Sequence, residues 1–182
     1  MTIRLGLALR AAVCGMAAVT LPGAGPATTG EKAPHLTHVF TAKITLSPPI
    51  EQGEIDGGRR RFVPITGGSV EGPRFTGTVL PGGGDWQTIY PGGFTRIEAR
   101  YFLKAADGTV VGIHNPGVRV ASASVSEQLA RGEKVDPGSY YFRSSPIFDP
   151  PPGRHQWLRN KVFVGRGIRM PDHVLLEVYM VD

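Results

Sequence analysis

The chain has 182 residues, with 20 Lys and Arg, 15 Asp and Glu, and a formal net charge of +5. This length predicts one domain with a substantial core, and the 25 glycines and 16 prolines favour a turn-rich all-β architecture over a helical one. The mildly basic balance slightly favours anionic or carboxylate-bearing small ligands, and we expect no nucleic-acid partner.

The first 27 residues have the pattern of a signal peptide. Basic residues at Arg4 and Arg10 precede an apolar stretch, and small residues lead up to Ala27. We therefore predict cleavage after Ala27, a flexible lead over 28–34, and a periplasmic or secreted domain over 35–182 without stable membrane insertion. The alternative is a mis-assigned start codon upstream of a cytosolic protein.

Short stretches of alternating polarity, separated by glycine and proline turns, predict strands along the rest of the chain. The cleanest alternation lies at 94–105, where charged and apolar side chains occupy opposite faces. Further strands are predicted at 35–46, 62–65, 75–80, 109–114, 139–148, 156–164 and 173–181, with a loop at 50–56. We expect turns at Gly67-Gly68, at 115–117 and at 165–167.

Strands that arrive about every ten residues imply a sandwich or a closed barrel. We predict a single antiparallel β-barrel, because the long strands carry charge on one face and apolar residues on the other. One short helix is expected at 124–131, with Ser124 or Ser126 as N-cap and Gly132 just after its end. A lone helix of this kind is expected to cap one end of the barrel.

Several short sequence motifs follow one another through nearly the whole predicted domain. They are IEQG, GGRRRFVPITGG, VEGP, GTVLPGGGDWQ, IEARY, YYFR and WL followed by VFVG. In these motifs and their order, the chain from about His35 onward resembles the family catalogued as domain of unknown function 3237. The resemblance implies an antiparallel β-barrel of bacterial, sometimes fungal, origin with no settled activity. The family has asparagine directly after Trp-Leu, whereas Arg159 stands there in this chain and Asn160 comes next.

Two carboxylates are the candidate catalytic groups. Asp85 follows three glycines and precedes Trp86, so it is either a partly buried acid beside an aromatic wall or an acceptor for the amides of the glycine turn. Glu98 and Arg100 share one strand face. If that face lines a cavity, Glu98 is a second base and Arg100 a clamp for a carboxylate or enolate; if it faces solvent, they form an ordinary ion-pair ladder.

The candidate ligand-binding residues are basic, aromatic or amide side chains. At most two of the three consecutive arginines at 59–61 share a face, and we expect one of them to pair inward with an acid. A phenol and a guanidinium at 140–143 could hold a bound oxyanion. The full set is Arg60, Trp86, Arg100, Tyr140, Tyr141, Arg143, Trp157 and Asn160.

We expect neither a metal nor another cofactor. The five histidines are scattered, and no phosphate loop, nucleophile elbow or dinucleotide fingerprint is present. The only cysteine, Cys14, lies in the predicted signal peptide. What remains is a cofactor-independent isomerase, cyclase, hydratase or lyase acting on a small, partly apolar oxygenated ligand. The alternatives are a non-catalytic carrier of lipocalin type and a structural or assembly protein that forms a homodimer.

Overall fold

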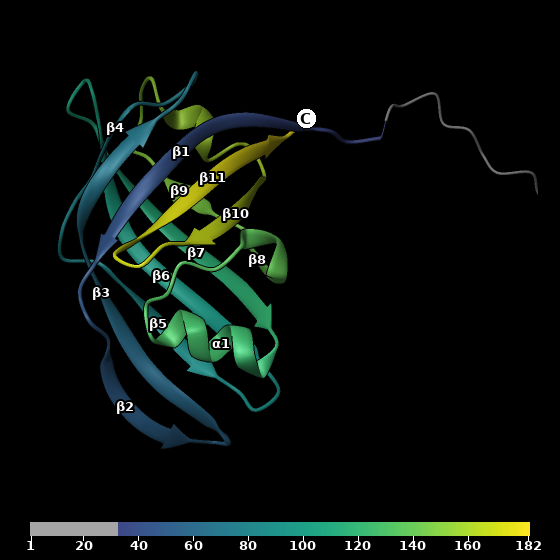
Figure 1. Ribbon diagram of the computed structural model, residues 1–182. Coiled ribbons are helices and arrows are strands. Elements are labelled where there is room, and N and C mark those ends of the chain that lie inside the picture. Colours follow the sequence, from purple (N-terminus) through teal and green to yellow (C-terminus); the bar gives the residue numbers. More distant parts are fainter. Residues whose placement is uncertain (1–32) are drawn as a thin grey trace, which may run out of the picture. The chain divides into compact units, whose positions relative to one another are not determined.

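The computed structural model describes residues 33–182, and these residues contain a closed antiparallel β-barrel (Figure 1). The predicted signal peptide and nearly all of the predicted lead lie outside the described residues. Eight strands close the barrel in the order β6-β5-β3-β1-β11-β10-β8-β7, and β7 pairs again with β6. Their bounds are β1 Leu36–Leu46, β3 Gly58–Glu71, β5 Gly84–Ile89, β6 Phe94–Ala105, β7 Val110–Ala121, β8 Tyr140–Ser144, β10 Phe163–Arg169 and β11 His173–Val181. The predicted fold class is confirmed.

Three short strands extend this barrel. β2 (Ile50–Ile55) forms a hairpin with β3 that projects at the lower end in Figure 1, so the predicted loop at 50–56 is wrong. β4 (Gly77–Val79) pairs with both β3 and β6. β9 (Ile147–Asp149) pairs with β7. Pro146 separates β8 from β9 and cannot donate to a ladder, which explains why the strand predicted at 139–148 is divided.

Three glycine-containing segments that we predicted as turns lie inside strands. β3 runs through Gly67-Gly68, β7 through 115–117 and β10 through 165–167. A Cβ on Gly117 would lie 2.7 Å from the carbonyl oxygen of Arg143, and one on Gly165 would overlap the hydroxyl of Ser144. These glycines therefore permit close approach of neighbouring strands rather than reversal of the chain.

Helix α1 (Ala123–Ala130) follows β7 and lies across the lower end in Figure 1. Its N-cap is Ser122, whose hydroxyl accepts a hydrogen bond from the amide of Val125 at 3.3 Å, two residues before the earliest cap we predicted. Gly132 follows the C-cap with φ of +74°, as expected. Leu129 packs with Ile97 and other core residues, so α1 caps this end. No helix within 33–182 is long and apolar enough to cross a membrane.

The opposite end of the barrel is filled by side chains. One apolar cluster, built from buried residues of β1, β3, β4, β6, β7, β9, β10 and β11, reaches from the cavity wall to this end, where aromatic rings are in edge-on contact. Phe148, for example, meets Phe40 at 6.0 Å and Phe163 at 4.9 Å between ring centroids. The cavity that contains Asp85 lies in the part of the barrel nearer α1.

Candidate functional site

A cavity of about 460 Å³ lies inside the barrel at the α1 end. Its mouth is bordered by α1, by the prolines after β1 and by the turn before β11. Its apolar wall includes Ile44, Val63, Ile65, Ile97, Leu129 and Leu176. Among residues 33–182, no group of three or more His, Cys, Asp or Glu side chains is arranged to hold a metal ion. The cavity has the size and mixed lining of a small-molecule site.

Cross-strand register brings Asp85 into this cavity. Asp85 on β5 pairs with Val63 on β3 and with Ala99 on β6, and Ala99 pairs with Asn115 on β7. Residues directly opposite one another in antiparallel strands share a sheet face. Since Val63 and Ala99 are buried barrel residues, this ring places Asp85 and Asn115 on the inside.

Two arginines occupy rings nearer the mouth. Gln87 pairs with Arg61, and Arg61 Nε donates to Gln87 Oε1 at 2.9 Å. Arg119 pairs with Thr95 on β6, and both side chains are buried. Both arginines line the cavity on the same side of Asp85 along their strands. A single carboxyl group is thus bordered by two guanidinium groups.

The carboxyl group of Asp85 is held by two donors. Gln87 Nε2 donates to Oδ2 at 2.5 Å, and the backbone N–H of Glu98 donates to Oδ1 at 3.1 Å. Burial raises the pKa of Asp85, although these hydrogen bonds and the charges of Arg119 and Arg61 act in the opposite direction. Asp85 therefore keeps its proton at a higher pH than an exposed aspartate would.

Two further polar groups of the lining have no partner among the described residues. The hydroxyl of Tyr101 and Oδ1 of Asn115 are buried without a hydrogen bond. Burial, with a smaller contribution from the charge of Asp85, raises the pKa of Tyr101, so its phenol stays protonated. Because buried polar groups normally find partners, a polar ligand group or an ordered water in the cavity would satisfy them.

Of the ten residues predicted for the site, Asp85 lines the cavity and the others lie elsewhere. Glu98 lies on the outer face of β6, where its Oε2 is 2.9 Å from Nε2 of His114. Arg100 is exposed on that same face. Trp86 is 50% exposed and packs against Phe62 in a tilted arrangement, with 4.8 Å between ring centroids. The outer face of β6 is therefore the solvent-facing ladder that we weighed against a cavity wall.

Among the three consecutive arginines, the inward pair is Arg59 and Arg61 rather than Arg60. Arg60 points outward and forms an ion pair with Asp56 at 3.0 Å. Tyr140 is buried below α1, and its hydroxyl accepts a hydrogen bond from the backbone N–H of Arg169 at 3.0 Å. Tyr140 thus supports a cavity residue without lining the cavity itself.

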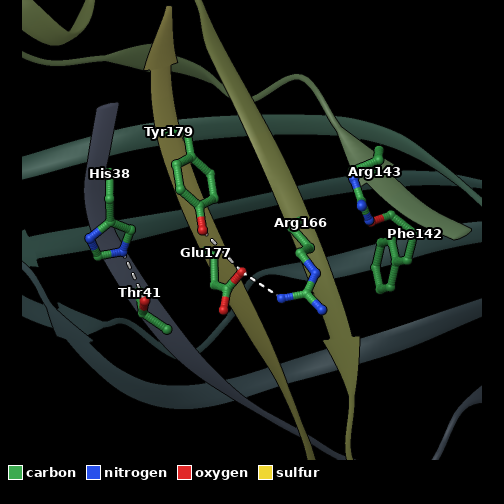
Figure 2. A network of polar contacts seen from close by, with 7 residues as sticks. All are labelled: His38, Thr41, Phe142, Arg143, Arg166, Glu177 and Tyr179. Atoms are coloured by element: carbon green, nitrogen blue, oxygen red, sulfur yellow. Dashed lines mark hydrogen bonds and ion pairs between the residues drawn. The ribbon is translucent and has the colours of Figure 1, made fainter. Parts of the chain in front are cut away.

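Tyr141 and Arg143 lie on the outside of the barrel. Tyr141 is 52% exposed, and the guanidinium of Arg143 lies 5.1 Å from the centre of its ring. Arg143 also donates to the backbone carbonyl of Phe142 at 2.9 Å. Figure 2 shows Arg143 beside the network in which Glu177 accepts hydrogen bonds from Arg166 and Tyr179. These contacts stabilise the outer sheet surface.

Trp157 and Asn160 lie at the filled end. Trp157 packs against Phe163, and the guanidinium of Arg74 lies 4.2 Å from the centre of its ring. Asn160 is exposed just after this turn. Neither residue lines the cavity.

The cavity residues absent from our predictions share one signal: each lies an even number of positions from a buried residue of its strand, and therefore on the same face. Arg61 lies two residues before the buried Val63, and Gln87 two residues after Asp85. Tyr101 belongs to the apolar face of the alternation at 94–105, where its hydroxyl is the polar group that stands out. Asn115 and Arg119 were obscured by the turn that we predicted at 115–117.

Comparison with known proteins identifies the family. The family described as "Protein of unknown function (DUF3237)" matches residues 34–181. A UPF0311 protein of Clostridium acetobutylicum is 39% identical over 155 residues, which cover 85% of this chain and 98% of the relative. The crystal structure of a conserved protein of unknown function from Rhodopseudomonas palustris matches with a TM-score of 0.78 and 36% identity, covering 84% of this chain and 100% of that one.

A fungal enzyme is also related. The hydroalkoxylation enzyme of Penicillium herquei is 33% identical over 165 residues, which cover 91% of this chain and 92% of that enzyme. The resemblance seen in the sequence is confirmed by the family match and by the bacterial relatives. The chain belongs to the DUF3237 family of β-barrel proteins.

Proposed function

We propose that this protein binds a small, partly apolar oxygenated ligand in the barrel cavity and catalyses a proton-transfer reaction on it, with Asp85 as the acid–base group. The observation that carries the proposal is a carboxyl group of raised pKa inside a cavity of about 460 Å³. A general acid needs a pKa near the working pH and a position beside the bound ligand. Asp85 lines the cavity in which a ligand would bind, and burial shifts its pKa upward, toward a working pH.

The surroundings of Asp85 suit a reaction in which charge develops on oxygen. Arg61 is linked to Asp85 through Gln87, and Arg119 lies close enough for its charge to act on the Asp85 pKa. Preorganised donors of this kind stabilise a developing oxyanion in a site that excludes water. The apolar wall would hold the carbon skeleton of the ligand.

The fungal relative suggests the class of reaction. The activity named for that relative is hydroalkoxylation, the addition of the O–H bond of an alcohol or phenol across a carbon–carbon double bond, which forms an ether. In this reaction the hydroxyl oxygen would bond to one carbon of an alkene conjugated with a carbonyl, so that negative charge develops on the carbonyl oxygen, and Asp85 would give its proton to the other alkene carbon. The carboxylate then takes up the hydroxyl proton, so Asp85 ends in its starting state and no other reactant is consumed.

Ring closure of unsaturated alcohols and phenols tests this proposal. The product is an isomer of the substrate, so it is detected by chromatography and NMR, and one deuterium enters at carbon when the reaction runs in D₂O. We expect the wild type to close a ring on at least one member of such a panel and Asp85→Asn to lose at least about a hundredfold in rate, the usual scale of general acid–base catalysis. Asp56→Asn is the control, because Asp56 lies at the exposed β2–β3 turn.

Two results would contradict a catalytic role for Asp85. Equal rates for the wild type and Asp85→Asn would remove the aspartate from the reaction. Binding of panel members without any conversion by the wild type would favour a non-catalytic carrier. Thermal unfolding of each variant separates loss of chemistry from loss of the fold.

A further inference from the structure

The ionisable groups that line the cavity are mainly cationic. The lining contains Arg59, Arg61, Arg119, Arg131 and Arg169, against Asp85 and Asp172. Some of these arginines have carboxylate partners near the mouth: Glu133 pairs with Arg131 at 2.7 Å, and Glu51 approaches Arg59 at 3.6 Å. In the deeper part of the cavity, the arginines have fewer carboxylate partners.

Arg119 is the deep cation of this set. It is 8% exposed and lines the cavity, and its nitrogens are not among the fully buried polar atoms without a partner within residues 33–182. Burial, with smaller contributions from the charges of Arg61 and Arg169 and against that of Asp85, lowers its pKa to about 10. Arg119 therefore lies among other cations, with the carboxyl group of Asp85 as its acidic neighbour.

Asp85 does not neutralise this region fully. Its two oxygens already accept hydrogen bonds from Gln87 and from the backbone of Glu98, so neither is committed to a guanidinium, and burial raises its pKa. A guanidinium that faces a cavity without a carboxylate partner depends on water for its hydrogen bonds, since a charged group out of reach of both water and a partner is costly. A ligand that supplies an anionic oxygen pair would replace that hydration.

We propose that the cavity selects ligands that carry a carboxylate, which the guanidinium of Arg119 binds, with Arg61 as a second cation. A guanidinium presents parallel N–H donors that match the two oxygens of a carboxylate. The apolar wall takes the hydrocarbon part of the same molecule. This inference rests on the ligand-binding half of the proposed function and is independent of whether Asp85 catalyses a reaction.

A pair of probes of equal shape and different charge tests the inference. 2-Naphthoate carries a carboxylate, and 2-naphthalenemethanol replaces it with a neutral hydroxymethyl group. We expect calorimetric titration to show at least about tenfold tighter binding of the naphthoate, since hydrogen bonds to charged groups exceed neutral ones by about that factor. The preference should survive high salt, because buried charges are screened far less than exposed ones.

Variants then show which side chain causes the preference for 2-naphthoate over the alcohol. Arg119→Met should abolish the preference for naphthoate and leave binding of the alcohol within about twofold, while Arg119→Lys should restore part of it. Arg100→Met is the matched control, since Arg100 is exposed on the outer face of β6, outside the cavity. Arg61→Met should weaken the preference by a smaller factor. Thermal unfolding checks that every variant is folded.

The inference is overturned if the wild type binds the two probes equally, if it binds neither at millimolar concentration, or if the preference survives Arg119→Met. Asp85→Asn should keep the preference, because the proposed clamp does not include that carboxyl group. Lost ring closure with an intact naphthoate preference would sink the catalytic proposal alone. Ring closure without any charge preference would sink this inference alone.

Discussion

Burial and hydrogen bonding act on Asp85 in opposite directions. Removal from water raises its pKa, whereas Gln87, the Glu98 amide and the nearby arginines favour the ionised form. The donors hold the carboxyl group in place without making it a permanent anion. This combination is what an acid–base group requires, because it must be both positioned and able to exchange its proton.

The raised pKa of Asp85 predicts a specific pH dependence of stability. A folded-state pKa above the ordinary 3.8 means that the folded protein binds this proton more tightly than the unfolded chain does. The resulting stabilisation is complete below the ordinary value and is lost as pH rises through the folded-state pKa. Asp85→Asn lacks this dependence, so its free energy of unfolding relative to wild type should rise through that window and then level off.

Urea unfolding of both proteins from pH 3 to 8 measures this difference. Groups that are common to the two proteins and independent of Asp85 cancel. Arg61 on β3 and Arg119 on β7 act on the Asp85 pKa, and the charge of Asp85 acts on the pKa of Tyr101 on β6. If the free energy of unfolding of Asp85→Asn minus that of the wild type falls with rising pH, the Asp85 pKa is lowered rather than raised.

Sequence reasoning found Asp85 but selected Arg60 where Arg61 lies in the cavity. A strand turns successive side chains to opposite faces, so an uncertainty of one residue exchanges the inner for the outer set. The run of three arginines carries no polarity pattern of its own. Which of these arginines face the interior becomes clear only from the buried Val63 and Ile65 further along β3.

At the scale of elements, alternation predicted β6 at 94–105 and β11 at 173–181 with the bounds that the structure shows. Both strands have a regular pattern and turn residues at each end. The predictions failed where glycine has two uses. Gly67-Gly68, Gly117 and Gly165 resemble turn residues in the sequence, yet their role is to allow close contact with neighbouring strands.

β3 illustrates the use of glycine within a strand. Its first part pairs with β5 through 59–64, and its last part pairs with β4 through 68–70. Gly68, with φ of +144°, lies where the strand changes partner, and a Cβ there would overlap the carbonyl oxygen of Lys43 on β1. This bend lets one long strand follow the barrel wall past two neighbours.

We therefore expect Gly68→Ala to be strongly destabilising. Backbone strain alone costs about 1–3 kcal/mol, and the overlap with β1 adds to it. Gly82→Ala is the matched control, because Gly82 has φ of +98° but no atom within 4 Å of the added Cβ. Thermal or urea unfolding should show a clearly larger loss for Gly68→Ala, and equal losses would mean that strand contact at Gly68 is unimportant.

At the scale of the whole molecule, one end of the barrel is packed and the other is hollow. Aromatic rings fill the end near β4 and β9, whereas small or polar residues such as Ala99, Gln87 and Asn115 face the centre nearer α1. The hollow end therefore coincides with the charged side chains. Sequence patterns predicted closure of the barrel, but they could not predict which end stays open, because that depends on side-chain volumes summed around eight strands.

Export is the prediction that concerns the chain as a whole. Gly25 and Ala27 place small residues at the first and third positions before the predicted cleavage site, as signal peptidase requires. When the full chain is expressed in a bacterium, the periplasmic fraction should contain a protein whose intact mass corresponds to a chain that begins at Thr28. Ala27→Leu should block processing and leave the precursor attached to the membrane. A cytosolic protein with the mass of the full, unprocessed chain would contradict export. The ligand of the cavity would then have to be sought among intracellular molecules.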